Sequence, residues 1–122
     1  MKFAKIVFWI AGIWGFLVIT PLYFMFDLIG RKDPPPITHP GFFYGFVGCA
    51  LAWQLAFCFI ATDPIRYRPL MIPSVLEKAT FAIAIVTLVL QGRTHSSDLV
   101  FVCTDSLLGI LFVISYFKTR RQ

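Results

Sequence analysis

Residues 63–78, DPIRYRPLMIPSVLEK, divide this 122-residue chain into two strongly apolar halves. The stretch contains three prolines, two arginines and an adjacent glutamate and lysine, whereas long uncharged segments lie on both sides of it. Proline removes a helical hydrogen bond and disfavours helix at the residue before it. Pro73, however, fits the first turn of a helix, where its missing N–H has no consequence. The part before Pro73 is therefore predicted to be a hinge that leads into a new helix.

The composition indicates an integral membrane protein with a single domain, residues 1–122. Hydrophobic residues make up 58% of the chain and charged residues 14%, and there are 14 phenylalanines. A soluble globular domain has about 25% charged residues, and a body of this size has too little interior to bury so many aromatic side chains. A bilayer is the solvent that suits this composition.

Four segments are long and apolar enough to cross a membrane, because about 20 apolar residues span the hydrocarbon core. They cover about residues 6–27, 41–62, 73–91 and 98–117. The first segment follows Lys2 and Lys5, as the apolar region of a signal peptide would. Its apolar part is too long for one, and no small-x-small cleavage site follows, so we predict a retained helix.

The connections complete the predicted fold. Residues 31–40, RKDPPPITHP, are expected to form a non-helical loop, because three consecutive prolines favour an extended path. The predicted fold class is therefore all-α: an integral membrane bundle of four antiparallel transmembrane helices joined by short loops.

The basic residues predict the orientation of this bundle. Both termini and the hinge hold seven of them: Lys2, Lys5, Arg66, Arg68, Lys118, Arg120 and Arg121. The other two loops hold three: Arg31, Lys32 and Arg93. The positive-inside rule places both termini in the cytoplasm, in a multi-pass protein of the inner (plasma) membrane. Despite the net charge of +5, no nucleic-acid partner is expected, because no basic stripe is interleaved with aromatic residues.

Asp105 is the first candidate for a functional group, since it lies inside the fourth span with no basic residue within a turn of it. A carboxylate in hydrocarbon costs several kcal/mol unless it is paired, hydrated or neutral. Two interpretations remain open: a proton-accepting or ligand-binding carboxylate, or a structural hydrogen bond to the first helix or to a backbone group. Asp27, on one face of the first span with Thr20 and Tyr23, is a second candidate toward the same outer side.

A second polar group is expected nearer the cytoplasm, around the hinge. Lys78 is predicted to reach the membrane interface with its long side chain. Glu77 is shorter, and it must either pair with Arg66 or Arg68 or become protonated. These residues are interpreted as a structural clamp on the hinge or, alternatively, as a basic site for anionic lipid headgroups.

The second span has a small-residue face and one buried amide. Small residues recur at steps of three and four and predict a face for close helix packing; they are Gly41, Gly45, Gly48, Ala52 and Ala56. Gln54 lies on roughly the opposite face, where its amide requires a partner. That partner is either a polar group of another helix or a ligand.

The sequence offers no recognisable catalytic, metal or cofactor site. No histidine lies within a predicted span, which argues against haem ligation in the bundle, and no metal-ligand spacing, nucleophile elbow, phosphate loop or dinucleotide fingerprint occurs. The three cysteines, Cys49, Cys58 and Cys103, form no CxxC pair and are interpreted as packing residues.

Three stretches carry a family resemblance: HPGFFYGFVGCALAWQLAF (39–57), DPIRYRPLMIPSVLEK (63–78) and TDSLLGILF (104–112). Through them the chain resembles a group of uncharacterised bacterial four-helix inner-membrane proteins over nearly its whole length. In helix count and size it is also similar to the DoxX-like proteins. The first resemblance implies that the hinge, Trp53-Gln54, Glu77-Lys78 and Asp105 belong to the family pattern, but it implies no activity.

Three functions are consistent with these features. The leading hypothesis is a non-enzymatic membrane protein that binds lipids or partner helices, as an accessory subunit or a homo-oligomer. The second is a small proton-linked transporter that uses Asp105 and Glu77 and requires a water-accessible cavity beside them. The third is an intramembrane lipid-modifying enzyme with one of these acids as general acid or base, which requires an apolar pocket open to the bilayer.

Overall fold

The computed structural model describes residues 2–32, 38–93 and 98–119. The described chain is all-α and contains no strand. Its long helices are α1 (Lys2–Ile19), α3 (Pro40–Thr62), α4 (Met71–Leu90) and α5 (Leu99–Lys118). Together with short 3-10 turns at the ends of α1 and α4, these are four segments long and apolar enough to cross a membrane. The predicted all-α bundle is confirmed, and the four helices indicate a multi-pass membrane protein.

The first span differs from the single helix predicted over 6–27. Helix α1 ends at Ile19 and continues as a 3-10 turn, η1 (Thr20–Phe24), before a separate short helix, α2 (Phe26–Lys32). Pro21 explains the change, because it lacks the N–H that would continue the α-helical ladder. Asp27 consequently lies in the first turn of α2, outside the long helix.

The predicted non-helical segment 31–40 is too long at both ends. Arg31 and Lys32 belong to α2, and Pro40 is the first residue of α3. A proline is compatible with the first position of a helix, since the N–H there has no helical partner. The three consecutive prolines lie outside the described residues.

The hinge comprises residues 63–70, between α3 and α4, and it is fixed to the end of α5. The short 3-10 turn η2 (Arg68–Leu70) closes the hinge, and α4 begins at Met71 rather than at Pro73. The guanidinium group of Arg68 lies 3.6 Å from the centre of the Tyr116 ring, and Arg68 Nε donates a hydrogen bond of 3.0 Å to the Tyr116 carbonyl oxygen. The hinge is therefore clamped, but by a cation–π contact with α5 rather than by an ion pair with Glu77.

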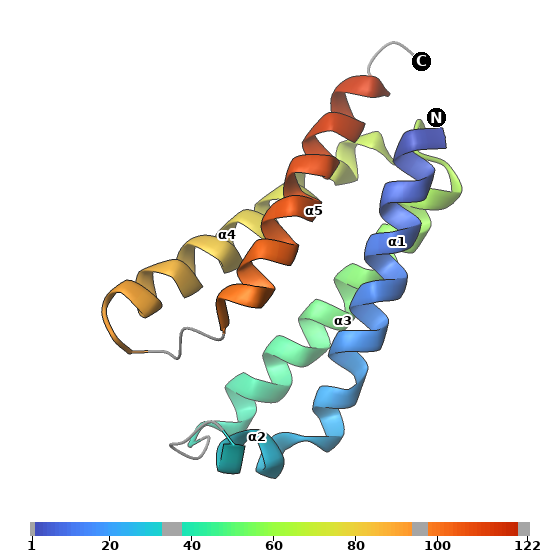
Figure 1. The fold of residues 1–122 in the computed structure, drawn as a ribbon. Coiled ribbons are helices and arrows are strands. Elements are labelled where there is room, and N and C mark those ends of the chain that lie inside the picture. Colours follow the sequence, from blue (N-terminus) through green and yellow to red (C-terminus); the bar gives the residue numbers. More distant parts are fainter. Residues whose placement is uncertain (1, 33–37, 94–97, 120–122) are drawn as a thin grey trace.

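The four long helices form two hairpins that meet at one end and diverge toward the other, α1 with α3 and α4 with α5 (Figure 1). Both termini and the hinge lie at the end where the hairpins meet. A cluster of fully buried aromatic rings joins the hairpins there: Phe8 stacks on Phe112 with ring centres 4.3 Å apart, and Phe57 packs edge-on at 4.9 Å from Phe112. This core fixes one end of the bundle and leaves room between the hairpins beyond it.

Two glycines of α1 permit its close approach to α3. A Cβ at Gly12 would lie 2.5 Å from Cys58 Sγ, and a Cβ at Gly15 would overlap the carboxamide of Gln54. Only a residue without a side chain fits at either position. Small residues at a helix interface allow two backbones to approach closely, and this pair was not among the positions predicted for packing.

Most of the small-residue face predicted on α3 does not pack against the described residues. A Cβ at Gly41 or Gly45 would meet nothing within 4 Å, and Ala52 is exposed. At Gly48 the nearest group is the Tyr23 hydroxyl, at 3.4 Å. The opposite face of α3, with Val47, Gln54 and Phe57, is the one that is buried.

Candidate functional site

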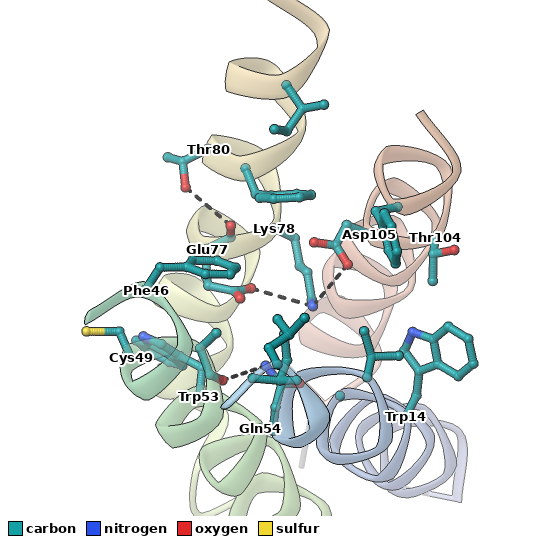
Figure 2. Close-up of a pocket in the computed structure, with 18 of the residues that line it drawn as sticks. Trp14, Phe46, Cys49, Trp53, Gln54, Glu77, Lys78, Thr80, Thr104 and Asp105 are labelled. Carbon is teal, nitrogen blue, oxygen red and sulfur yellow. Dashed lines mark hydrogen bonds and ion pairs between the residues drawn. The ribbon is translucent and has the colours of Figure 1, made fainter. Parts of the chain in front are cut away.

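A cavity of about 630 Å³ lies between the two hairpins, beyond the buried aromatic core. All four long helices contribute to its wall (Figure 2). Most of the wall is apolar, and five aromatic side chains form much of it: Trp14, Phe46, Trp53, Phe81 and Phe101. A pocket of this size accommodates a drug-sized molecule or part of a lipid.

A buried ion cluster forms the polar part of the wall. Lys78 Nζ lies 3.3 Å from Asp105 Oδ1 on α5 and 3.6 Å from Oε2 of its neighbour Glu77. The Lys78 side chain is only 6% exposed, whereas those of Asp105 and Glu77 retain 21% and 22%. Figure 2 shows the ammonium group between the two carboxylates. Mutual pairing is the usual way in which charged groups are tolerated within a membrane.

The position of Lys78 depends on a glycine of the neighbouring helix. A Cβ at Gly109 of α5 would lie 3.3 Å from Lys78 Cβ, so the two backbones approach closely at this level. From there the lysine side chain reaches Asp105, which lies four residues, about one helical turn, farther from the hinge. On α5, Gly109 thus leaves room for the base of the Lys78 side chain, and Asp105, one turn away, pairs with its ammonium group.

Three sequence-based predictions are corrected by this arrangement. Lys78 is buried, and its ammonium group pairs with a carboxylate of α5 instead of extending away from the bundle. Glu77 faces Lys78 rather than Arg66 or Arg68. The partner of Asp105 is a side chain of α4, neither the first helix nor a backbone group. Asp105, assigned to the outer polar group, therefore belongs to one cluster with Glu77 and Lys78, which were assigned to the cytoplasmic group.

Gln54 lies in the same wall with half of its amide unsatisfied. Its Nε2 donates a hydrogen bond of 2.7 Å to the carbonyl oxygen of Ala50, within its own helix. Its Oε1 is buried and has no hydrogen-bond partner, and the residue is 2% exposed. A buried acceptor without a partner costs about 1–3 kcal/mol. Within the described part of the chain Gln54 makes no interhelical hydrogen bond, and Gly15, which faces the amide on α1, offers no side chain.

The cavity thus brings together some of the predicted site residues and leaves out others. Gln54, Glu77, Lys78 and Asp105 line it. Asp27 is exposed on α2, Arg66 is exposed in the hinge, and Arg68 contacts Tyr116. The aromatic walls were not predicted as part of a site, because nothing in the sequence shows which face of each helix turns toward the space between the hairpins.

Two hydroxyl donors of the polar wall are already used. The hydroxyl groups of Thr80 and Thr104 donate to carbonyl oxygens of their own helices, and the Gln54 amide donates one hydrogen bond in the same way. The carboxylates of Glu77 and Asp105 are the charged groups that stay partly uncovered, next to an aromatic surface. Among the described residues, no group of three His, Cys, Asp or Glu side chains is placed to hold a metal ion.

Comparison with protein-family models, curated proteins and solved structures gave no match to this chain. The resemblance to bacterial four-helix inner-membrane proteins and to the DoxX-like proteins stays a prediction.

Proposed function

We propose that this protein binds a lipid-like amphiphile in the cavity between its two hairpins. One observation carries the proposal: a cavity of about 630 Å³ with aromatic walls ends at a buried cluster of Lys78, Asp105 and Glu77. An amphiphile matches both parts, because its chain can contact Trp53 and Phe101 while its polar end meets the charged cluster.

The energetics favour an occupied cavity. Charged groups within a membrane are tolerated when they pair or face a polar surrounding, and both carboxylates keep about a fifth of their side-chain surface uncovered. Hydrocarbon chains would leave that surface without hydrogen bonds. A ligand with a polar end supplies them, and its chain fills the remaining apolar space. This supports lipid binding, the leading function expected from the sequence.

The experiment is photolabelling with alkyl probes that carry a diazirine in the chain and either an amine or an alcohol at the end. We expect saturable labelling of the segments that contain Trp53 and Phe101. Cys49 and Cys103 are both exposed free cysteines, but only Cys49 lines the cavity. Cys49→Phe should therefore reduce labelling severalfold, whereas Cys103→Phe should not. Absence of saturable labelling by either probe, or equal reduction by both substitutions, refutes the proposal.

The same cavity meets the requirement of the other two hypotheses. An apolar pocket beside Glu77 and Asp105 suits a lipid-modifying enzyme, and two carboxylates that share one ammonium partner suit a proton-linked carrier. Asp105→Asn distinguishes these functions, because it keeps the shape of the side chain and removes its titration. Retained binding with loss of turnover, or of proton-coupled uptake into vesicles, would support an enzyme or a carrier over a binding protein.

We further propose a bacterial inner-membrane location with both termini in the cytoplasm. The support is the clustering of basic residues at the end of the bundle where both termini and the hinge lie together (Figure 1). Cytoplasmic ends of membrane proteins carry an excess of Lys and Arg. An even number of spans places the termini on one side, as this arrangement requires.

A further inference from the structure

The charged cluster presents its carboxylates, and not its ammonium group, to the cavity. Lys78 is the one basic residue in the described wall. Its Nζ is enclosed by Asp105, by Glu77 and by the Phe57 ring, whose centre lies 5.2 Å away. The side chain is 6% exposed, against 21% and 22% for the two carboxylates. An anionic headgroup entering the cavity would therefore meet carboxylate oxygens before it reached the lysine.

The carboxylates are the acceptors that a ligand in the cavity can reach. Oε2 of Glu77 is buried and faces Lys78, but the Glu77 and Asp105 side chains keep about a fifth of their surface uncovered. The hydroxyl groups of Thr80 and Thr104 donate hydrogen bonds to backbone carbonyl oxygens. A ligand that binds the exposed carboxylate oxygens supplies N–H or O–H groups.

The formal charge of the cluster selects among such donors. With both acids ionised, Glu77 and Asp105 bring two carboxylates to one lysine, and a cationic ligand balances the remaining negative charge. A hydroxyl group donates a hydrogen bond but brings no charge, and a quaternary ammonium brings charge but no donor. A primary ammonium brings both, with three N–H donors. Charge-assisted hydrogen bonds of this kind are stronger than neutral ones.

We infer that the ligand of this cavity is a primary alkylammonium amphiphile, whose ammonium group binds the exposed carboxylate oxygens of Glu77 and Asp105 while its chain lies along the aromatic wall. This assignment rests on the proposed ligand-binding function and narrows it to one chemical class. A lysine in the wall of a cavity would by itself suggest a site for an anionic lipid headgroup. The preference for an ammonium group distinguishes this cavity from such sites.

Competition among four amphiphiles of one chain length tests the inference. The amine photoprobe labels the reconstituted protein in the presence of dodecylamine, dodecanol, dodecyltrimethylammonium or dodecanoate. Dodecylamine should compete at a concentration at least about tenfold lower than each of the other three, because only it supplies both charge and donors. Equal or better competition by dodecanol, dodecyltrimethylammonium or dodecanoate overturns the inference, while saturable labelling of the cavity still supports the proposed function.

Removal of the carboxylates gives the matched control. Glu77→Gln and Asp105→Asn should each reduce the preference for dodecylamine over dodecanol severalfold, whereas Asp27→Asn, outside the cavity, should leave it unchanged. An unchanged preference in a folded Glu77→Gln or Asp105→Asn variant contradicts the assignment. The competition series on the unmodified protein decides the question even where these variants do not fold.

Discussion

The ammonium nitrogen of Lys78 lies 3.3 Å from Oδ1 of Asp105, across the contact between α4 and α5. The two residues are 27 positions apart in the sequence, and both lie well inside predicted spans. Each makes the other tolerable in the membrane, because an unpaired charge at this depth would cost several kcal/mol. The pair links α4 to α5, and it also forms part of the polar wall of the cavity.

The effects of removing these two charges should not be additive. Lys78→Met should lower the free energy of unfolding by about 3 kcal/mol, since it leaves two buried carboxylates without their partner, whereas Asp105→Leu should cost less because Lys78 keeps Glu77 at 3.6 Å. The double variant should lose clearly less than the sum of the two. Reversible unfolding in mixed micelles measures all three, with Lys5→Met on the exposed face of α1 as control. Strict additivity would show that the pair is not coupled.

Gly15 should not tolerate even a methyl group. Gly15→Ala places a Cβ on the Gln54 carboxamide, and such overpacking typically costs about 1–3 kcal/mol. A second substitution, Gln54→Ala, should restore much of the loss because it removes the overlapping group. Thermal unfolding in detergent measures the effect. Gly45→Ala is the control, since a Cβ there meets nothing within 4 Å; equal losses at the two glycines would contradict the observed packing.

The stacking of Arg68 on Tyr116 should make this arginine irreplaceable by lysine. Arg68→Lys loses the planar contact at 3.6 Å and the Nε hydrogen bond to the Tyr116 carbonyl, with an expected loss of about 1–2 kcal/mol. Arg66→Lys, in the same hinge but exposed, should change stability by less than about 0.5 kcal/mol. Unfolding midpoints of the two variants, measured side by side, check this expectation.

The proposed orientation predicts which ends of the bundle reagents can reach. In a variant with all three cysteines replaced by alanine, Thr38→Cys and Ile65→Cys place single thiols at exposed positions at the two opposite ends. In intact cells, an impermeant maleimide should label Thr38→Cys at once and Ile65→Cys only after permeabilisation, because basic residues accumulate at the hinge end. The reverse pattern would place the termini outside the cell.

The fold could largely be read from the sequence, because the length of apolar segments is set by the thickness of the bilayer. The exact ends of the helices were harder to predict. Pro21 ends α1 earlier than hydropathy alone indicates, and Arg31 and Lys32 join a helix that the following prolines seemed to forbid. In both places the backbone preference of proline acts over one turn, a shorter distance than any hydropathy window resolves.

The sequence predicted some residues of the site but not their arrangement. Asp105, Glu77 and Gln54 stand out as polar residues inside apolar segments, and all three line the cavity. That Asp105 and Glu77 belong to one cluster depends on the register between α4 and α5, which approach closely at Gly109 and Lys78. Helix periodicity gives the face of a single helix and contains no information on the height at which two helices meet.

The ion pair also bears on the order in which the chain can enter a membrane. Helix α3 contains no charged residue, and α1 carries its two lysines at its very start, so each can leave a translocation channel unaided. Helix α4 carries Glu77 and Lys78, and a charged residue near a helix centre adds about 2.5–3.5 kcal/mol to insertion. The partner that offsets this, Asp105, emerges from the ribosome later. Helix α4 is therefore expected to stay in the translocation channel until α5 has been synthesised. The two helices of the second hairpin would then enter the lipid together.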